Sequence, residues 1–537
     1  MTQDIALIKR REFLQFFGKT AALIGLASCA PLAPKNSQFI NKKLEPFKGL
    51  KPMRTDELRM ARGFKYDVLM KFKDTINSNG DQFGYDNDFL AIFEIPNKKD
   101  EFILWANHES VNSLFVSGFD KNQVLVAKTK AQVESEMKAV GGSLLHLVKV
   151  DGKYKHLLNS PYNRRLDAFT KIPFSNGEKI KGESVAIGTF ANCAGGVTPW
   201  KTVLTAEENY QNFYGDVKHV SAGVIKDQIQ PWTFDWSLHY QRPPEHYGWI
   251  VEVDPFSGKA KKHTSLGRFA HEGATTVISK DKKVCVYLGD DSNDQCFYKF
   301  VSQDDKSLNR GTLYVANLEK GEWVALTMDH PQLKNNFKDL LEILTFARKA
   351  AKLVGGTPLD RPEDCEIDPV SGAIYLCCTN NFGKGRPFGS ILKFEELEDY
   401  SGKKFKSSVF VAGGYDTGIA SPDNLAFDKK GNLWMTTDIS DEKMGDEKHA
   451  PFGNNALFYI PMSGEFAGSA IRVAEAPMDS ELTGPCFSAD GKTLFLSIQH
   501  PGANSKSLEN LTSHWPEGGS ALPKPSVVQI HLPDFVS

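Results

Sequence analysis

The sequence predicts an all-β fold, a six-bladed β-propeller with helical and loop insertions. A β-rich apolar run that ends in polar, often acidic residues recurs along the chain. Its six copies are FILWANHES from Phe102, TVLTAEENY from Thr202, VCVYLGDDSND from Val284, IYLCCTNN from Ile374, NLWMTTDIS from Asn432 and TLFLSIQHPG from Thr493. Several copies follow a turn of aspartate and glycine (DPVSG, DKKG, ADG), which is a hairpin signal. Units spaced by about 60 to 100 residues, each too small to bury its own face, favour a radial arrangement around one axis.

A short polar motif precedes several of these hairpins: NCAGG, AHEG, RPED, SPDN and LTGP. If equivalent strands run in the same direction around the axis, their polar ends meet at one face of the propeller. Between two units, the stretch NFKDLLEILTFARKAAKLVGG at 336–356 has apolar residues at helical spacing, so we expect a helical insertion there. Its basic run at 347–352 is interpreted as a solvated helix face.

The pattern divides the chain into a leader at 1–28, a linker at 29–50 and a single propeller domain at 51–537. In the leader, the pair Arg10–Arg11 precedes a mild apolar run, which is typical of a twin-arginine export signal. The sequence LASC ending at Cys29 resembles a bacterial lipobox, which predicts cleavage before Cys29 and a lipid on its sulfur. The alternative is a simple secretory leader with an incidental cysteine. The expected location is therefore periplasmic or at the cell surface, with the membrane contacted only through the lipid.

Composition excludes some partners. The 64 Lys and Arg residues nearly balance the 66 Asp and Glu residues, so no basic excess points to nucleic acid. No segment after the leader resembles a membrane span. We expect a monomer that acts on small molecules.

The eight cysteines include no Cys-x-x-Cys pair and do not resemble a disulfide framework in a chain of this length. Cys285, Cys377 and Cys378 lie in apolar strand-like runs and are interpreted as buried thiols. Cys193 differs, because it lies in a glycine loop just before a glutamate-bearing strand.

Acidic residues gather at the predicted strand ends. Carboxylates brought together repel one another unless cations neutralise them, so we interpret the set as metal ligands; the alternative for any single one is a solvated strand end. Oxygen ligands suit calcium or magnesium, whereas the thiolate of Cys193 suits iron or zinc, which together imply a mixed site. The candidate carboxylates are Glu207, Glu208, Glu272, Asp290, Asp291 and Glu363.

Six motifs, in this order, resemble those of the PhoX-type alkaline phosphatases: NCAGGVTPWKTVLTAEEN, RFAHEGA, YLGDDSNDQCFYKFV, RPEDCEIDPVSGAIY, SPDNLAFDKKGNLWMTTD and TGPCFSADGKTLFLSIQHPG. With FGYDNDF near Phe83, the resemblance covers most of the chain after the leader. It implies a six-bladed propeller, a centre of ferric iron (Fe³⁺) and calcium (Ca²⁺), hydrolysis of small phosphate monoesters, and export through the twin-arginine route.

The resemblance also implies roles for single residues. Cys193 would be a thiolate ligand of iron, and Arg361 would hold the phosphate with its planar fork. The carboxylate ligands of iron or calcium would be Glu207, Glu208, Glu272, Asp291 and Glu363. The family's usual TPWGTWLTCEE is replaced here by TPWKTVLTAEE, so Lys201 and Ala206 stand for a glycine and a cysteine. This difference bears on the local loop shape and leaves the implied ligands in place.

The chemistry implied by the resemblance is phosphoryl transfer assisted by metal ions. A serine hydrolase is not expected, because the propeller region has no Gly-x-Ser-x-Gly elbow, and a phosphate-binding Walker loop is also missing. One alternative is a calcium-dependent propeller lactonase or phosphotriesterase, which would need neither Cys193 nor iron. Another is a non-catalytic surface propeller whose acidic motifs bind only structural calcium. Some residues fit a pocket and a strand-end role equally well: Asp88, Asn107, His108, Glu109, Asp423, Asn424 and His500.

Overall fold

The computed structural model describes residues 47–120, 127–231 and 233–536. The twin-arginine leader, Cys29 and most of the expected linker lie outside the described residues. Within them, Phe47 already packs on Phe64 and Tyr459, and the Leu50 amide donates to the Arg472 carbonyl at 2.9 Å. Packing onto the propeller therefore begins a few residues before position 51.

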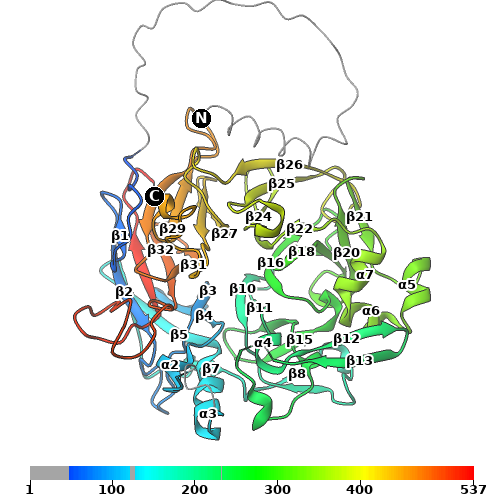
Figure 1. Ribbon diagram of the computed structural model, residues 1–537. Helices are drawn as coiled ribbons and strands as arrows, with labels where there is room; N and C mark the ends of the chain where they lie inside the picture. Colours follow the sequence, from blue (N-terminus) through cyan, green and yellow to red (C-terminus); the bar gives the residue numbers. More distant parts are fainter. Residues whose placement is uncertain (1–46, 121–126, 232, 537) are drawn as a thin grey trace, which may run out of the picture. The chain divides into compact units, whose positions relative to one another are not determined.

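The main strands form six antiparallel sheets, confirming the predicted six-bladed propeller (Figure 1). Blade 1 comprises β3 (Asn87–Glu94), β4 (Glu101–His108), β5 (Gly141–Val150) and β6 (Lys153–His156), with β7 (Arg164–Leu166) also on β5; blade 2 comprises β10 (Asn192–Val197), β11 (Val203–Glu207), β14 (Ile250–Val253) and β15 (Ala260–His263). Blade 3 comprises β16 (His271–Ile278), β17 (Val284–Asp290), β19 (Phe297–Asp304), β20 (Ser307–Asn317) and β21 (Glu322–Ala325); blade 4 comprises β23 (Pro362–Ile367), β24 (Ile374–Cys378), β25 (Ser390–Glu396) and β26 (Phe405–Ala412). Blade 5 comprises β27 (Pro422–Phe427), β28 (Leu433–Thr437), β29 (Ala456–Ile460), β30 (Ile471–Glu475) and β1 (Arg59–Met60); blade 6 comprises β31 (Glu481–Phe487), β32 (Thr493–Gln499), β33 (Ser526–His531) and β2 (Lys65–Lys71).

The ring closes by pairing the two ends of the described chain. Strand β2 runs antiparallel to β33, from Lys65 opposite His531 to Lys71 opposite Ser526. The innermost strands touch their neighbours in the order β3, β10, β16, β23, β27, β31 and back to β3. Closure of this kind leaves the innermost edges mutually protected and fixes six equivalent strand starts around one axis.

Apolar side chains fill the space between neighbouring sheets, as alternation of buried faces along each strand requires. Between blades 3 and 4, for example, Tyr287 and Phe297 pack with Leu376 and Phe394. The cysteines at 285, 377 and 378 are free and buried in these layers, as predicted.

Long connections gather on one face of the propeller. The first and second strands of each blade are joined by short turns, whereas the links from second to third strand include 109–140, 208–249 and 500–525. These and the inter-blade links carry the small sheets β8 (Lys171–Pro173) with β9 (Val185–Ile187), β12 (Asp216–Ser221) with β13 (Val224–Ile229), and β18 (Asn293–Gln295) with β22 (Leu359–Asp360). Helices in them are α2 (Ser113–Val116), α3 (Lys130–Ala139), α4 (Gln211–Tyr214), α5 (Pro331–Asn336), α6 (Leu340–Thr345) and α7 (Ala347–Leu353). Single 3₁₀ turns are η1 (Ser175–Gly177), η2 (Trp236–Leu238), η3 (Pro244–His246), η4 (Thr264–Leu266), η5 (Phe382–Lys384) and η6 (Ala450–Phe452).

The helical insertion expected at 336–356 is present as two short helices, α6 and α7, instead of one long helix, and α5 precedes it and ends at Asn336. Asp339 caps α6 by accepting from the Glu342 amide, which starts a new helix within the stretch. Among the described residues, no helix has the length and apolar character needed to cross a membrane.

Candidate active site

A cavity of about 250 Å³ lies where the innermost strands begin. Its walls come from all six blades, and every blade except blade 4 contributes the end of its second strand as well as the start of its first strand. The lining residues are Asp86, Asp88, Glu109, Ser110, Cys193, Glu208, Asn209, Glu272, Asp291, Arg361, Glu363, Asp423, Asp438, Glu481, Gln499 and His500.

Irregular pairing at the start of each innermost strand places part of this set. In every blade the register between first and second strand shifts there, for example between Asn192 and Gly195 in β10. A β-bulge re-aims the side chains beside it. The cavity residues at or within these shifts are Asp88, Cys193, Glu272, Glu363 and Asp423.

The backbone just before four of these strands is in the left-handed region, which costs a non-glycine residue on the order of 1 kcal/mol. The residues concerned are Asp86 (φ 51°), Ala191 (φ 56°), Arg361 (φ 53°) and Ser421 (φ 54°). Each lies two positions before a bulge residue of the cavity. The same left-handed backbone conformation, two residues earlier, thus helps to position Asp88, Cys193, Glu363 and Asp423.

The second strands of five blades supply further residues by a simple rule: the residue that follows the strand's last residue lines the cavity. Glu109 follows β4, Glu208 follows β11, Asp291 follows β17, Asp438 follows β28 and His500 follows β32. Polar ends of separate units therefore converge on one face, as the repeated sequence phrase predicts.

The acidic side chains and one thiol form a continuous chain of potential ligand groups. Three sets have their ligand atoms within 4.8 Å of one another: Asp88, Glu109 and Cys193; Cys193, Glu208 and Glu272; and Glu272, Glu363 and Asp423. Cys193 and Glu272 each belong to two sets. The Sγ atom of Cys193 also lies 2.9 Å from Oδ2 of Asp88.

Burial makes the charged forms of these groups costly in the absence of a cation. Burial first, and the neighbouring acids second, raise the pKa of Glu109 to about 8, and burial raises the pKa of Asp88 to about 6. The pKa values of Glu208, Glu272 and Glu363 are raised well above the usual range by the same two causes. Burial and the adjacent carboxylates likewise raise the pKa of the Cys193 thiol.

Several of these buried oxygens have no hydrogen-bond partner within the described chain. They are both carboxylate oxygens of Glu272, Oε1 of Glu208 and Oδ1 of Asp88. Native proteins seldom leave such atoms unpaired, because each carries a desolvation penalty. Unpaired oxygens beside a thiol are the donor set that a cluster of cations would satisfy, so the residues present fit metal binding.

Arg361 reaches the edge of this cluster and contacts three carboxylates. Its Nε and Nη2 atoms donate to Asp291 at 2.9 and 2.7 Å, Nη2 lies 2.9 Å from Oε1 of Glu363, and Nη1 lies 3.2 Å from Oδ2 of Asp438. Burial opposes its charge, but the three carboxylates outweigh burial and hold the pKa of Arg361 well above its usual range. Arg361 is therefore a fixed cation beside the acidic cluster.

Two predicted ligands, Glu207 and Asp290, lie elsewhere. Glu207 belongs to β11 itself, and its buried carboxylate accepts from Nζ of Lys262 at 2.6 Å and from the Gly248 amide at 3.0 Å. Asp290 is the last residue of β17 and pairs with Arg348. Successive residues of a strand point to opposite faces, so only the second acid of each pair reaches the cavity. We therefore do not retain Glu207 or Asp290 as ligands.

Of the residues that fitted two roles, four line the cavity: Asp88, Glu109, Asp423 and His500. The others hold the backbone, since Asn107 donates to the Ala194 carbonyl at 3.0 Å and Asn424 accepts from the Gly484 amide at 2.8 Å. His108 is buried in blade 1 against Ser143 Oγ at 2.7 Å. The sequence reasoning missed Asp438 and Glu481, although Asp438 follows the strand NLWMTT in the same way as Glu208 follows its own strand.

The adjacent glutamates provide a matched test. We expect Glu208→Gln to lower the metal content of the purified protein, because an amide is a weaker ligand than a carboxylate. Glu207→Gln should leave metal content per folded chain unchanged but destabilise the protein by about 3 to 5 kcal/mol, because Lys262 loses its buried counter-charge. Elemental analysis and thermal unfolding of both variants give the comparison. Equal metal loss in the two variants would contradict the separation of roles.

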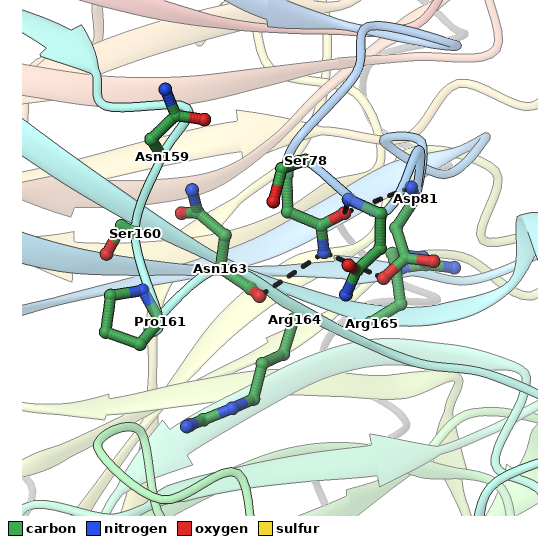
Figure 2. Close-up of a pocket in the computed structure, with 10 residues that line it drawn as sticks. Ser78, Asp81, Asn159, Ser160, Pro161, Asn163, Arg164 and Arg165 are labelled. Atoms are coloured by element: carbon green, nitrogen blue, oxygen red, sulfur yellow. Dashed lines mark hydrogen bonds between the residues drawn. The ribbon is translucent and has the colours of Figure 1, made fainter.

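A larger pocket of about 720 Å³ lies away from these acids, between the segment 77–81 and residues 159–165 beside β7 (Figure 2). Two of its side-chain amides are already paired: Nδ2 of Asn77 donates to Oδ2 of Asp81 at 2.8 Å, and Nδ2 of Asn163 donates to the Leu157 carbonyl at 2.8 Å. None of the predicted site residues lines it. Pocket volume therefore does not identify the candidate site. The unpaired carboxylate oxygens of the smaller cavity identify it.

Comparison with known proteins gives a family model that matches most of the chain and a solved structure with a similar fold. The family model for alkaline phosphatase PhoX matches residues 45–502. The solved structure of Pseudomonas fluorescens PhoX in complex with vanadate, a transition state analogue, is 28% identical; the match covers 92% of this chain and 99% of that chain with a TM-score of 0.81. A protein of unknown function from Dyadobacter fermentans matches at 8% identity over 88% of this chain and 100% of that chain, with a TM-score of 0.41. A comparison with curated protein sequences gave no match.

The family model covers the region that holds all six innermost strands and every residue lining the acidic cavity. The alkaline phosphatase resemblance carried by the sequence motifs is therefore confirmed. From these matches and the shared propeller, this chain belongs to the PhoX alkaline phosphatase family and is a phosphatase.

Proposed function

We propose that this phosphatase hydrolyses phosphate monoesters at a mixed centre of ferric iron and calcium, and that it does so outside the cytoplasm as a monomer. The observation that carries the proposal is the continuous set of buried carboxylates around one thiol, with oxygens that no group of the described chain pairs. Support for the two metals comes from the donor types and from the family resemblance of the motifs.

The donor types suggest how the two metals divide the site. Iron suits the set of Cys193, Glu208 and Glu272, because a thiolate favours a softer, redox-capable cation. Calcium suits the all-oxygen set of Glu272, Glu363 and Asp423. Asp88 and Glu109 extend the first set on the other side of Cys193. Asp291 was expected to be a ligand, but both its oxygens face Arg361, so we propose that it orients that arginine.

Bound cations would neutralise the charge on the phosphate and polarise its oxygens as Lewis acids. The remaining roles fall to the chain's own residues. The buried acids hold the cations in a fixed array, and Arg361 offers a guanidinium whose fork matches two phosphate oxygens. Asp291 and Asp438 hold that fork in one orientation before substrate arrives, which is the form of electrostatic preorganisation that lowers a charged transition state.

Hydrolysis of p-nitrophenyl phosphate, compared with hydrolysis of a simple lactone under the same conditions, tests the reaction class. We expect turnover of the ester and none of the lactone. Lactone hydrolysis supported by calcium alone would instead favour the propeller lactonase, which requires no contribution from Cys193. Absence of both activities in protein that contains its metals would favour a binding propeller.

Removal of the metals should make stability fall with rising pH. Without cations, burial raises the pKa of Glu109 from 4.5 to about 8 and that of Asp88 from 3.8 to about 6, so the folded chain keeps protons that the unfolded chain releases. Where the folded state binds more protons, raising the pH favours unfolding, so stability is lost between about pH 4 and about pH 8. We expect the melting temperature of chelator-treated protein to fall by several degrees from about pH 5 to about pH 8, and that of metal-loaded protein to change much less. A chelated protein whose melting temperature rises over that interval would contradict the assignment.

Export can be tested in the leader. Replacing Arg10 and Arg11 by lysine should retain the protein in the cytoplasm, because the paired arginines are the feature of the predicted signal. Cys29→Ala should release a soluble form if a lipid on Cys29 is the anchor. Cell fractionation measures both, and unchanged export of the double lysine variant would count against the twin-arginine route.

A further inference from the structure

Arg348 contacts the residues on both sides of Asp291. Its Nε atom lies 3.0 and 2.9 Å from the two carboxylate oxygens of Asp290, and its Nη2 atom lies 3.3 Å from Oγ of Ser292. Asp291 lies between these two anchors, and its own oxygens accept from Nε and Nη2 of Arg361 at 2.9 and 2.7 Å. Two arginines therefore bind neighbouring aspartates. Arg348 binds Asp290 behind the cavity wall, and Arg361 binds Asp291 within the cavity.

Arg348 is held in place by the insertion that carries it. It lies in α7, where Ala347, Ala350 and Ala351 are buried in the same apolar cluster as Leu288 and Tyr298 of blade 3. The packing of the helix on the blade fixes the distance between Arg348 and the end of β17. Figure 1 shows α6 and α7 beside β20 of that blade.

Lys349, the next residue of α7, contacts the small strand β12 and not the end of β17. Nζ of Lys349 lies 2.8 Å from Nδ1 of His219 and donates to the Val220 carbonyl at 3.0 Å, both in the small strand β12. The prediction that the basic run at 347–352 is a solvated face is therefore wrong for Arg348 and Lys349. Lys352 of the same helix is exposed, as predicted.

Asp290 needs Arg348, because its side chain has no exposed surface and both its oxygens face the guanidinium. A buried carboxylate that loses its counter-charge is strongly unfavourable and must take a proton or move towards water. Either change would displace the end of β17, to which Asp291 is joined by a single peptide bond.

We propose that Arg348 is a positioning residue of the phosphatase reaction: by holding Asp290 and Ser292 it sets the carboxylate of Asp291, which in turn aims Arg361 at the substrate phosphate. The inference rests on the proposed role of Arg361 as phosphate binder. This role of Arg348 gives the helical insertion between blades 3 and 4 a function at the active site, although no residue of the insertion lines the cavity.

Kinetics of Arg348→Ala test the proposal. We expect KM for p-nitrophenyl phosphate and the inhibition constant of free phosphate to rise together by about tenfold, with kcat, iron content and calcium content changed much less. Arg348→Lys should restore part of the loss, since lysine keeps the charge but not the fork. Lys352→Ala, on the exposed side of the same helix, is the matched control and should behave as the unmodified protein. If Arg348→Ala does not fold, Asp290→Asn, which keeps the size of the side chain, provides the same comparison.

A double-mutant cycle separates positioning from general destabilisation. If Arg348 acts through Arg361, adding Arg348→Ala to Arg361→Ala should raise KM no further, because coupled residues are not additive. Additive losses would overturn the proposal, and so would normal phosphate inhibition in folded Arg348→Ala. Failure of the proposed function is a different result: Arg361→Ala alone would then have normal kinetics.

Discussion

Replacement of Cys193 by serine is expected to remove iron and phosphatase turnover together. A serine hydroxyl stays protonated near neutral pH and is a harder, poorer ligand for iron than a thiolate. The position is central, because Cys193 belongs to two of the three ligand sets, so its loss should disrupt both. We expect kcat to fall by at least about a hundredfold, as replacement of a direct ligand should cost no less than replacement of an outer-shell partner. Elemental analysis and p-nitrophenyl phosphate kinetics on the same preparation measure the two quantities.

The control for this variant is Cys486→Ser, a partly buried free thiol on β31 that lines no part of the cavity. It should keep its metals and its activity. A Cys193→Ser protein with full iron content would show that the thiol is not a ligand, whatever its activity.

Removal of the Arg361 guanidinium is expected to impair phosphate binding while iron and calcium remain bound. A charge-assisted contact of this kind contributes roughly 1.5 to 3 kcal/mol, so kcat/KM for a phosphate monoester should fall at least about tenfold in Arg361→Ala. The loss has a second cause, because Asp291 and Asp438 would lose the cation that now separates them from an approaching phosphate. Inhibition by free phosphate should weaken in parallel.

Arg361→Lys is the informative comparison for that variant. It restores one positive charge without the planar fork, so inhibition by phosphate should recover in part and kcat/KM less. Normal kinetics in folded Arg361→Ala would remove Arg361 from the account, and loss of both metals in that variant would make it a structural residue of the metal centre.

The repeated phrase was sufficient to predict the propeller because each unit carries its own hairpin, and hairpin signals are local. The same phrase located most of the site: Cys193, Glu272 and Glu363 stand at equivalent points of separate units, and the structure brings them to one cavity. Convergence of this kind follows from radial repetition, which gives equivalent residues equivalent positions around the axis.

The placement of Glu207 and Asp290 outside the cavity has a single physical origin. The side-chain period of a strand is two, so in a pair of adjacent acids only one can face the cavity, and the choice depends on where the strand ends. That boundary is the least certain feature of a sequence-based assignment. Alignment of the six units on their last strand residue would have selected Glu208 and Asp291, and would also have indicated Asp438.

The contacts of Arg348 could not be predicted in this way. Its partner Asp290 is distant in sequence, and the helix that carries Arg348 belongs to an insertion outside the repeat. Periodicity identified the helix but could not indicate what its basic residues touch, because that depends on tertiary packing.

We propose that this phosphatase requires iron and calcium together in one acidic cavity. The most direct test of this proposal is elemental analysis of the purified protein by mass spectrometry, with p-nitrophenyl phosphate turnover measured before chelation, after chelation, and after the return of each metal alone and both together. We expect both metals to be present, chelation to abolish turnover, and only the two metals together to restore it. A preparation that is fully active with calcium alone would contradict it.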